Sequence, residues 1–397
     1  MMLHIIQKLN RCDWFLFSWV LYYLQGILYP EGGILSISLL SINLIVSICC
    51  ATKVIQLPGT PLYFKGLNML LCLFTIYGFI YILVNPSSIY YPLSGKTIHT
   101  YNYIKSIYLS LLPIYAFYYF TRTGYLTKRY FLIWGGVFLV SVVLSYFKTQ
   151  QEMLNELIES GSSMEEITNN SGYLFVSCLP LLVLYKKYPI LQFLALAIVL
   201  GFIVMGMKRG AIVIGIIAFT YFVLRSIRNY RGGVKIVFIL LIIILCFVAV
   251  YFFEYEMANS DYMAKRLQDT LDGNSSGRDN LYTHFWDYFI HKANLIHFLF
   301  GRGANGTLEV YYNFAHNDWL EIAVGQGLLG IYVYFFYWKC LYKTIKKTTN
   351  SNSKTILVLM MIIFFMKTFF SMSYVDMSYV CTSVLGYALA TMYKPNC

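Results

Sequence analysis

Two arginines and one histidine occupy positions where each could take part in chemistry. Arg209 and Arg278 both fall in the first turn of an expected helix, where the helix dipole disfavours a cation unless an anion binds there. Guanidinium groups and helix N-termini both bind phosphate oxygens, so each arginine is a candidate for an anion site. His316 comes just before another expected helix, whose N-terminus disfavours imidazolium and predicts a neutral side chain at pH 7. A neutral imidazole is a candidate general base.

Each of these residues also has a purely structural interpretation, which the sequence alone leaves open. Lys208 and Arg209 form a short turn between two apolar runs, where both side chains could instead reach toward lipid headgroups. Arg278 could be a solvated surface arginine, and His316 could be a polar histidine at the membrane interface. The anion interpretation has one advantage, because it explains why cations stand at the starts of helices.

Capping residues predict where the elements around these side chains begin. Asp318 and Glu321 have the spacing of a capping box and predict a helix that runs from there to about Tyr342. Ser276 and Asp279 have nearly the same spacing and predict a helix over about 279–299. One apolar stripe on that helix predicts that it packs on the protein or at the interface, as a cap over a cavity at membrane level. The stripe consists of Leu281, Phe285, Tyr288, Phe289, Ile296 and Leu299.

The composition places these elements in a membrane. The chain has 397 residues, of which 58% are hydrophobic and 12% are charged, whereas soluble domains carry about 25% charged residues. Apolar runs long enough to cross a bilayer recur from end to end, so we expect a single all-α membrane domain over residues 1–397. Twelve spans are predicted, at residues 14–29, 33–51, 62–84, 106–121, 130–147, 171–185, 189–206, 210–224, 234–253, 319–342, 355–371 and 375–393.

Charges alternate between successive loops in the pattern that sets membrane topology. With the N-terminus in the cytoplasm, the cytoplasmic segments hold 19 of the 30 Lys and Arg residues and one of the 18 acidic residues. Both termini are therefore expected in the cytoplasm. The net charge of +12 then reflects topology and anionic lipid, and nucleic acid is not expected as a partner. Two long segments fall outside: 148–170, expected as a solvated amphipathic helix and turn, and the larger loop 254–315.

Other residues that often carry chemistry have structural explanations here. The nine cysteines fall mostly within apolar runs without a C-x-x-C pair, which is typical of small core residues. His284, His291 and His297 could share a helix face, but no carboxylate or cysteine completes a site, so no metal is expected. Three glycines are expected to let helices approach closely: Gly325, Gly327 and Gly330.

Four motifs in a fixed order resemble the signature block of the O-antigen ligase and polymerase superfamily. They are Ser-Gly-Arg at 276–278, a Gly-x-Gly turn at 301–303, a His-Asn-x-aromatic-Leu motif at 316–320, and Gly-Leu-Leu-Gly at 327–330. The turn at 208–210 resembles the family's Ser-Arg-Gly turn, with Lys208 in place of serine. The resemblance covers about residues 205–345, and the first 200 residues are similar to the family only in topology.

The resemblance implies a fold of the C-type glycosyltransferase kind, in which a large periplasmic loop caps a cavity open to the bilayer. It implies a bacterial inner-membrane enzyme that transfers undecaprenyl-diphosphate-linked glycan to a glycan or lipid acceptor, with no metal or other cofactor. In this chain it places Arg209 and Arg278 on the donor diphosphate and His316 near the acceptor. A flippase and a chain-length regulator are further candidate partners. Additional candidate substrate-binding residues are Lys208, Arg266, Arg302, Asn317 and Asp318.

Three activities remain as alternatives at this point. Polymerases join lipid-linked repeat units, and ligases move a finished chain to the lipid A core; the motifs do not separate them. We favour a polymerase of repeat units for O-antigen, capsule or exopolysaccharide, because polymerases are numerous and divergent. A flippase or transporter is less favoured, because transporters carry ionisable residues at mid-membrane. Here the spans are nearly free of charge, and Lys367, the main exception, is close enough to a helix end to snorkel.

Overall fold

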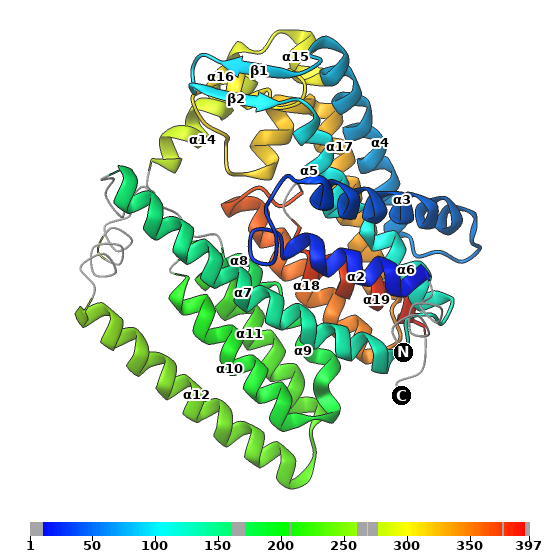
Figure 1. Cartoon of the computed structure of the whole chain (residues 1–397), viewed down its shortest axis with the longest axis vertical. Helices are drawn as coiled ribbons and strands as arrows, with labels where there is room; N and C mark the ends of the chain where they lie inside the picture. Colours follow the sequence, from blue (N-terminus) through cyan, green and yellow to red (C-terminus); the bar gives the residue numbers. More distant parts are fainter. Residues whose placement is uncertain are drawn as a thin grey trace.

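Helices make up nearly all of the secondary structure (Figure 1). The computed structural model describes residues 11–160, 171–206, 208–259, 268, 277–374 and 377–393. The predicted all-α polytopic membrane fold is confirmed, because seven helices in these ranges are long and apolar enough to cross a membrane. They are α3 (Ile34–Gln56), α4 (Tyr63–Val84), α7 (Lys128–Ser160), α11 (Arg209–Asn229), α12 (Gly232–Asn259), α17 (Asp318–Lys347) and α18 (Ser351–Phe370).

The other five predicted spans coincide with shorter or broken helices. One break falls at Pro113, which cannot donate a backbone hydrogen bond and starts a new helix instead. Each of the twelve predicted spans therefore has a helical counterpart, whereas the number of membrane crossings stays a prediction. The shorter elements are α2 (Arg11–Tyr23), α5 (Tyr101–Leu111), α6 (Pro113–Arg122), α8 (Ser171–Val176), α9 (Leu179–Leu182), the 3-10 helix η1 (Val183–Lys187), α10 (Pro189–Met205) and α19 (Tyr379–Thr391).

The core is an apolar and strongly aromatic interior between these helices. Two of its closest helix pairs are α19 on α6 and α17 on α4. Glycines lie at both contacts: a Cβ on Gly386 would come within 2.6 Å of the Phe117 Cβ, and one on Gly66 within 2.9 Å of the Tyr337 Cα. The helix α12 packs mainly on α10 at the edge of the bundle (Figure 1).

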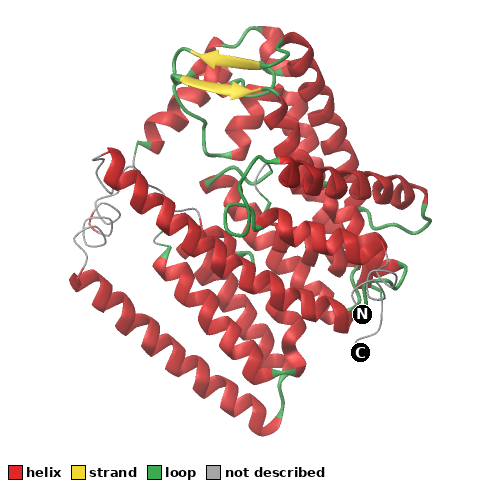
Figure 2. Ribbon diagram, in the orientation of Figure 1, coloured by secondary structure: helices red, strands yellow, loops and turns green. Residues whose placement is uncertain are grey.

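A hairpin and several short helices form a cap at one end of the bundle (Figure 2). The strands β1 (Ser88–Tyr91) and β2 (Lys96–His99) pair antiparallel, and the sequence analysis did not predict them. The predicted helix over 279–299 is wrong in extent. It divides into α14 (Arg278–Asp287), a π-helical turn η2 (Tyr288–Lys292) and α15 (Leu295–Phe300), and α16 (Thr307–Val310) follows. The new start at α15 is capped by Asn294, whose side chain accepts a hydrogen bond from the His297 amide.

The apolar stripe predicted for this segment divides in the same way. Leu281 and Phe285 of α14 are buried and pack against Leu320 and Val324 of α17. Ile296 of α15 is 67% exposed. The side chains of Leu281 and Phe285 therefore hold α14 onto α17, as predicted, whereas α15 packs on α17 without burying Ile296.

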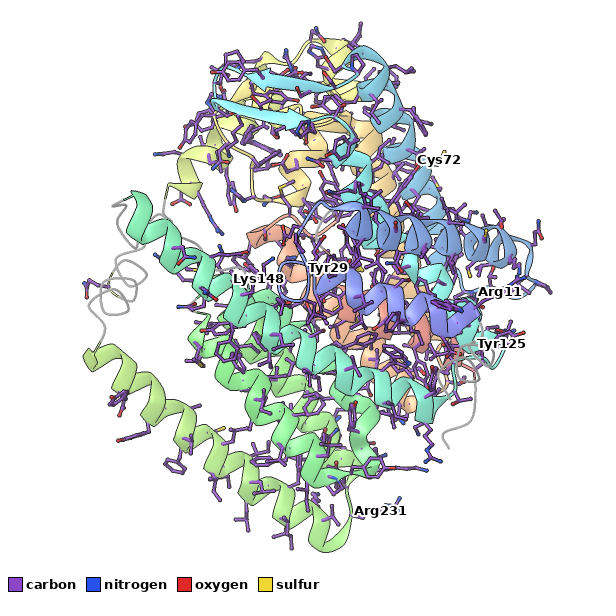
Figure 3. The ribbon with its side chains drawn as sticks, viewed as in Figure 1. Arg11, Tyr29, Cys72, Tyr125, Lys148 and Arg231 are labelled. Carbon is purple, nitrogen blue, oxygen red and sulfur yellow. The ribbon has the colours of Figure 1, made fainter. Side chains whose placement is uncertain are left out.

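The segment predicted as a separate amphipathic helix at 148–170 starts as a continuation of α7, which runs without a break to Ser160. Residues 161–170 lie outside the described part of the chain. Lys148 donates to the Gln25 carbonyl at 3.3 Å and pairs with Glu31 and, at 3.4 Å, with Glu152. Figure 3 shows Lys148 next to the loop of Tyr29, so this end of α7 is fixed to the connection between α2 and α3.

The helix α17 is interrupted at Gly327, whose backbone (φ 66°, ψ −159°) lies in a region open almost only to glycine. A Cβ there would lie 2.5 Å from the Leu299 carbonyl carbon. Next to this contact, the amides of Arg302 and Gly303 donate to carbonyl oxygens of α17 at 2.9 and 2.8 Å. Gly327 therefore lets the end of the helix α15 approach α17 closely, as expected, and the loop that follows α15 hydrogen-bonds to α17 as well.

Replacing Gly327 with alanine tests this interruption. The Gly327→Ala variant should be destabilised by several kcal/mol, because it combines backbone strain with a clash against backbone atoms. Thermal unfolding of the purified protein in detergent measures the change. Gly233→Ala is the matched control, because a Cβ at Gly233 meets nothing within 4 Å. Equal unfolding temperatures for the two variants would contradict the assigned geometry.

Candidate functional site

The starts of α11, α14 and α17 gather near the end of α18, and the predicted site residues lie on these elements. Arg278 is the first residue of α14, and its Nη1 donates to the carbonyl of Phe370, the last residue of α18, at 3.0 Å. Gly210, the second residue of α11, also packs on Phe370, since a Cβ there would lie 3.1 Å from the Phe370 Cβ. The turn of Arg209 and the start of α14 are thus brought together through Phe370.

His316 lies beside these helix starts in an unusual backbone conformation. Its φ is +50°, in the left-handed region that non-glycine residues seldom adopt and that occurs preferentially at functional sites. The amide of the preceding Ala315 donates to the Glu321 carboxylate at 2.5 Å. The other oxygen of that carboxylate accepts from the Thr307 hydroxyl at 2.7 Å. The buried Glu321 therefore holds the His316 loop against the cap.

The predicted capping box at 318–321 is wrong, because the helix is capped one residue earlier. The Asn317 side chain accepts from the amides of Trp319 and Leu320 at 2.9 and 3.2 Å, so Asn317 is the N-cap. Asp318 is fully buried instead, and it accepts from the Tyr334 hydroxyl at 2.5 Å and the Ser373 amide at 2.6 Å.

Three cations from three separate elements act electrostatically on His316. Burial, followed by Arg278, Lys208 and Lys96, lowers the pKa of His316 from 6.5 to about 4. The imidazole is therefore neutral at pH 7, as predicted, although burial and these cations are the cause in place of the helix dipole. We call the side chains of Lys96, Lys208, Arg278 and His316 the basic cluster.

Lys96 belongs to the hairpin and was missed by the sequence analysis. Its ammonium donates to the Asn313 side chain at 3.2 Å and lies 5.8 Å from the centre of the Phe314 ring. Both contacts are within three residues of His316, so the hairpin adds a cation to the site. No local sequence pattern predicts this role for Lys96, because the role depends on how the hairpin folds over the cap.

Tyr282, one turn after Arg278 on α14, is a second residue that was missed. Its hydroxyl donates to the Phe369 carbonyl at 3.0 Å and lies 3.5 Å from the His316 carbonyl. It also interacts with the side chains of Asn317 and Arg278. Its i+4 spacing from Arg278 is the only sequence signal that could have found it.

The other predicted substrate-binding residues that the structure describes make polar contacts within the protein. Arg302 is engaged within the protein: its Nε pairs with Glu309 at 2.9 Å and its Nη1 donates to the Tyr288 hydroxyl at 2.9 Å. Asn317 and Asp318 are engaged in the hydrogen bonds given above. Arg266 and Ser276 lie outside the described residues, and substrate contact by any of these residues stays a prediction.

Lys367 does not snorkel, contrary to the interpretation from sequence. It is only 4% exposed, and its ammonium lies 5.4 Å from the centre of the Tyr173 ring, at a distance typical of a cation–π contact. Lys367 is three residues before Phe370, so a further cation lies beneath the end of α18. Its charge also acts on the buried Asp318 carboxylate at the start of α17.

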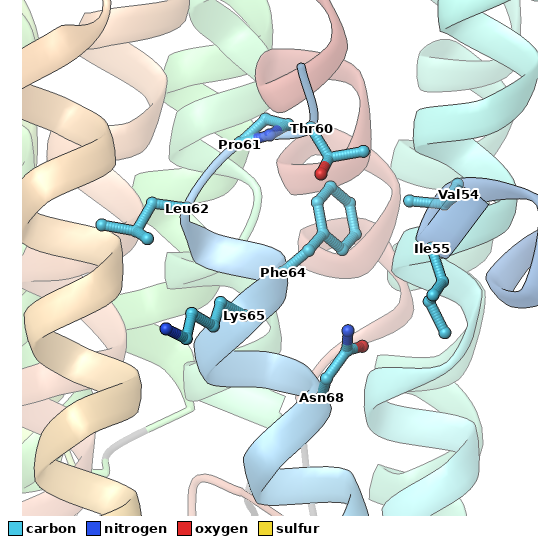
Figure 4. Close-up of a pocket in the computed structure, with 8 residues that line it drawn as sticks. All are labelled: Val54, Ile55, Thr60, Pro61, Leu62, Phe64, Lys65 and Asn68. Atoms are coloured by element: carbon cyan, nitrogen blue, oxygen red, sulfur yellow. The ribbon is translucent and has the colours of Figure 1, made fainter. Parts of the chain in front are cut away.

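A separate cavity lies between α3, the following turn and α4 (Figure 4). Val54 and Ile55 of α3 face Phe64 and Asn68 of α4, whereas the side chain of Lys65 points away from them. The lining is mainly apolar and contains no residue of the basic cluster. This cavity is therefore not the candidate site.

Comparison with protein families gives one match. Residues 194–335 match the model of the family described as O-antigen ligase. This segment of the chain is similar to the O-antigen ligase family. This confirms the predicted resemblance to the O-antigen ligase and polymerase superfamily, and the matched segment includes Arg209, Arg278 and His316. Neither the curated proteins nor the solved structures searched contain a match to the chain.

Within the described ranges, no three His, Cys, Asp or Glu side chains are grouped so that they could hold a metal ion. Residues such as Asp261 and Asp269 fall outside those ranges. Metal independence therefore stays a prediction, which the assay below addresses.

The lowered pKa of His316 predicts an unusual pH dependence. In the free enzyme the imidazole stays neutral to well below pH 6.5, so kcat/KM should hold nearly constant from pH 7.5 to about 5 and fall below that. The contribution of His316 to folding stability should fall as the pH drops from 6.5 toward 4, because only the unfolded chain binds this proton there. Lys96→Gln should move the acid limb of kcat/KM to higher pH, because it removes one of the cations. Lys105→Gln is the control, and an acid limb that Lys96→Gln leaves in place would contradict the arrangement.

Proposed function

We propose that this chain transfers a glycan from a lipid diphosphate to an acceptor hydroxyl, using Arg278 and Arg209 on the diphosphate and His316 as general base. The observation that carries the proposal is the basic cluster: a neutral histidine and cations from separate elements, gathered where three helices begin within the segment that matches the O-antigen ligase family. Helix starts and guanidinium groups both favour a bound phosphate. The lipid-linked glycan donor fits this site as a class of substrate.

The donor half of the reaction needs stabilisation of a leaving group. As the bond between the sugar C1 and the diphosphate oxygen breaks, negative charge grows on the diphosphate. Fixed cations in a poorly hydrated site stabilise that charge. Arg278 suits this role because the Phe370 carbonyl holds Nη1 and orients the guanidinium. Arg209 stands at the start of α11, next to the residue that packs on the same Phe370.

The acceptor half needs a base for the attacking hydroxyl. The acceptor oxygen forms the new bond to C1, and its proton passes to the imidazole of His316. A pKa of about 4 makes His316 a weak base in the free protein. A bound diphosphate would offset the charges of Lys96, Lys208 and Arg278, and the pKa of His316 would rise toward its ordinary value. The base therefore becomes effective when the donor is present.

The location of the reaction follows from the charge distribution between loops. We place both termini in the cytoplasm of a bacterial inner membrane and the basic cluster on the periplasmic side, with undecaprenyl diphosphate as the carrier. A flippase would then supply the donor, and a chain-length regulator would be a further partner. A reporter fused after Asn305 should give an external signal, and a cytoplasmic signal would contradict this topology.

Variants of Arg278 and His316 should separate the two halves of the reaction. Arg278→Lys keeps the charge but loses the bidentate hydrogen bonding of the guanidinium group. Binding of the lipid-linked donor and turnover should therefore both be strongly impaired. His316→Ala should lower turnover about 10²–10⁴-fold while donor binding remains nearly normal, because the base acts on the acceptor. Binding of purified lipid-linked donor and product formation, both with a chelator present, measure these effects.

Two results would contradict these roles. Near-normal turnover of His316→Ala would show that His316 is only an interface residue. Loss of wild-type turnover in the chelator, restored by a divalent cation, would show that the arginines do not suffice for the leaving group. Lys105→Gln, which alters a cation that does not act on His316, is the matched control for charge.

We favour a polymerase over a ligase, and gene deletion in the host distinguishes them. A lost polymerase should leave one repeat unit on each anchor, whereas a lost ligase should leave full-length lipid-linked chains and bare core. Gel analysis of surface glycan and of lipid-linked glycan measures the outcome. Restoration of the wild-type pattern by the intact gene, and not by Arg278→Lys, ties the result to the site.

A further inference from the structure

The hydroxyl of Tyr173 in α8 is buried without a hydrogen-bond partner in the described structure. Tyr173 is 5% exposed, and its hydroxyl oxygen is one of the few buried polar side-chain atoms in the described ranges that lack a partner. Other buried tyrosines have partners: the Tyr63 hydroxyl bonds to Tyr337 at 2.9 Å and the Tyr379 hydroxyl to Ser141 at 2.7 Å. A buried hydroxyl without a partner is unfavourable and calls for an explanation.

The Tyr173 hydroxyl lies against the first turn of α11. A Cβ on Gly210 would come within 2.2 Å of this oxygen, so the contact exists only because residue 210 is glycine. The helix α11 has 21 residues, and its N-cap residue Lys208 makes no side-chain capping bond. The first amides of a helix have no acceptor within the helix, so they point toward any anion bound here.

Positive charge from two other helices surrounds the same tyrosine. The ammonium of buried Lys367 in α18 lies 5.4 Å from the centre of its ring. Arg278 of α14 is close enough to act electrostatically on its hydroxyl, as is Tyr282. The donor hydroxyl of Tyr173 is thus placed between a helix N-terminus and two cations, which together suit a phosphate oxygen.

We propose that Tyr173 and the first turn of α11 form a subsite for the diphosphate, in which the Tyr173 hydroxyl donates a hydrogen bond to a phosphate oxygen of the lipid-linked donor. The inference rests on the proposed function, because it names a further residue for the same donor. Tyr173 lies before the matched segment 194–335, so neither the family match nor the sequence motifs single it out.

Loss of the Tyr173 hydroxyl should lower the affinity for the lipid diphosphate without lowering the stability of the protein. Tyr173→Phe removes no hydrogen bond within the described protein, so the ligand-free variant should unfold at the wild-type temperature or above it. Its affinity for undecaprenyl diphosphate should fall about 10- to 100-fold, as expected for one lost hydrogen bond to a charged group. Binding of undecaprenyl diphosphate and of undecaprenol to the full-length protein in nanodiscs measures this, and undecaprenol binding should not change.

Tyr379→Phe is the matched control, because that hydroxyl has a protein partner in Ser141. It should unfold at a lower temperature and bind undecaprenyl diphosphate normally. Gly210→Ala supplies an independent variant, since its Cβ displaces the Tyr173 hydroxyl and should weaken diphosphate binding in the same way.

The experiment distinguishes failure of the Tyr173 subsite from failure of the proposed function. If Tyr173→Phe binds the diphosphate as wild type does, or loses stability without losing affinity, the Tyr173 subsite is wrong and the proposed function stands. If the wild-type protein binds undecaprenyl diphosphate no better than undecaprenol, both the subsite and the proposed function are overturned.

Discussion

Two buried carboxylates at the start of α17 hold the site together. Glu321 accepts from the Ala315 amide and the Thr307 hydroxyl, and Asp318 accepts from the Ser373 amide and the Tyr334 hydroxyl. These bonds tie the cap, the His316 loop and the segment after α18 to one helix end. A hydrogen bond contributes about 0.5–1.5 kcal/mol on average, and a buried carboxyl group without partners is costly. The four bonds therefore fix the position of the His316 loop strongly.

The arrangement places like charges close together before any substrate binds. Lys96, Lys208 and Arg278 all disfavour a proton on His316, which shows that their fields overlap at one point. Such an arrangement is unfavourable in the free protein, and the surrounding fold must maintain it. A multiply charged anion relieves the repulsion and gains from every cation at once. Preorganised charge of this kind needs little rearrangement when negative charge develops on a leaving group.

Long apolar runs made the membrane helices predictable, because hydrophobic length alone decides whether a helix can cross a bilayer. Features set by tertiary contacts were not predictable. Asn317 and Asp318 are both good capping residues, and only the burial of Asp318 decides which of them caps α17. The hairpin at 88–99 has no long apolar alternation, and its cation Lys96 reaches the site through folding alone. The matched motifs located Arg278 and His316, because these residues lie on one contiguous stretch of sequence.

The cations that act on His316 come from separate parts of the sequence, and this limits which substitutions the chain can tolerate. The segment that matches the O-antigen ligase family spans residues 194–335, yet Lys96 lies outside it. A charge change on the hairpin thus alters the proton affinity of a histidine in the other half of the chain. Two halves that share one electrostatic field are expected to change together in evolution. A graft of the matched segment into another protein would carry the histidine without the field that sets its basicity.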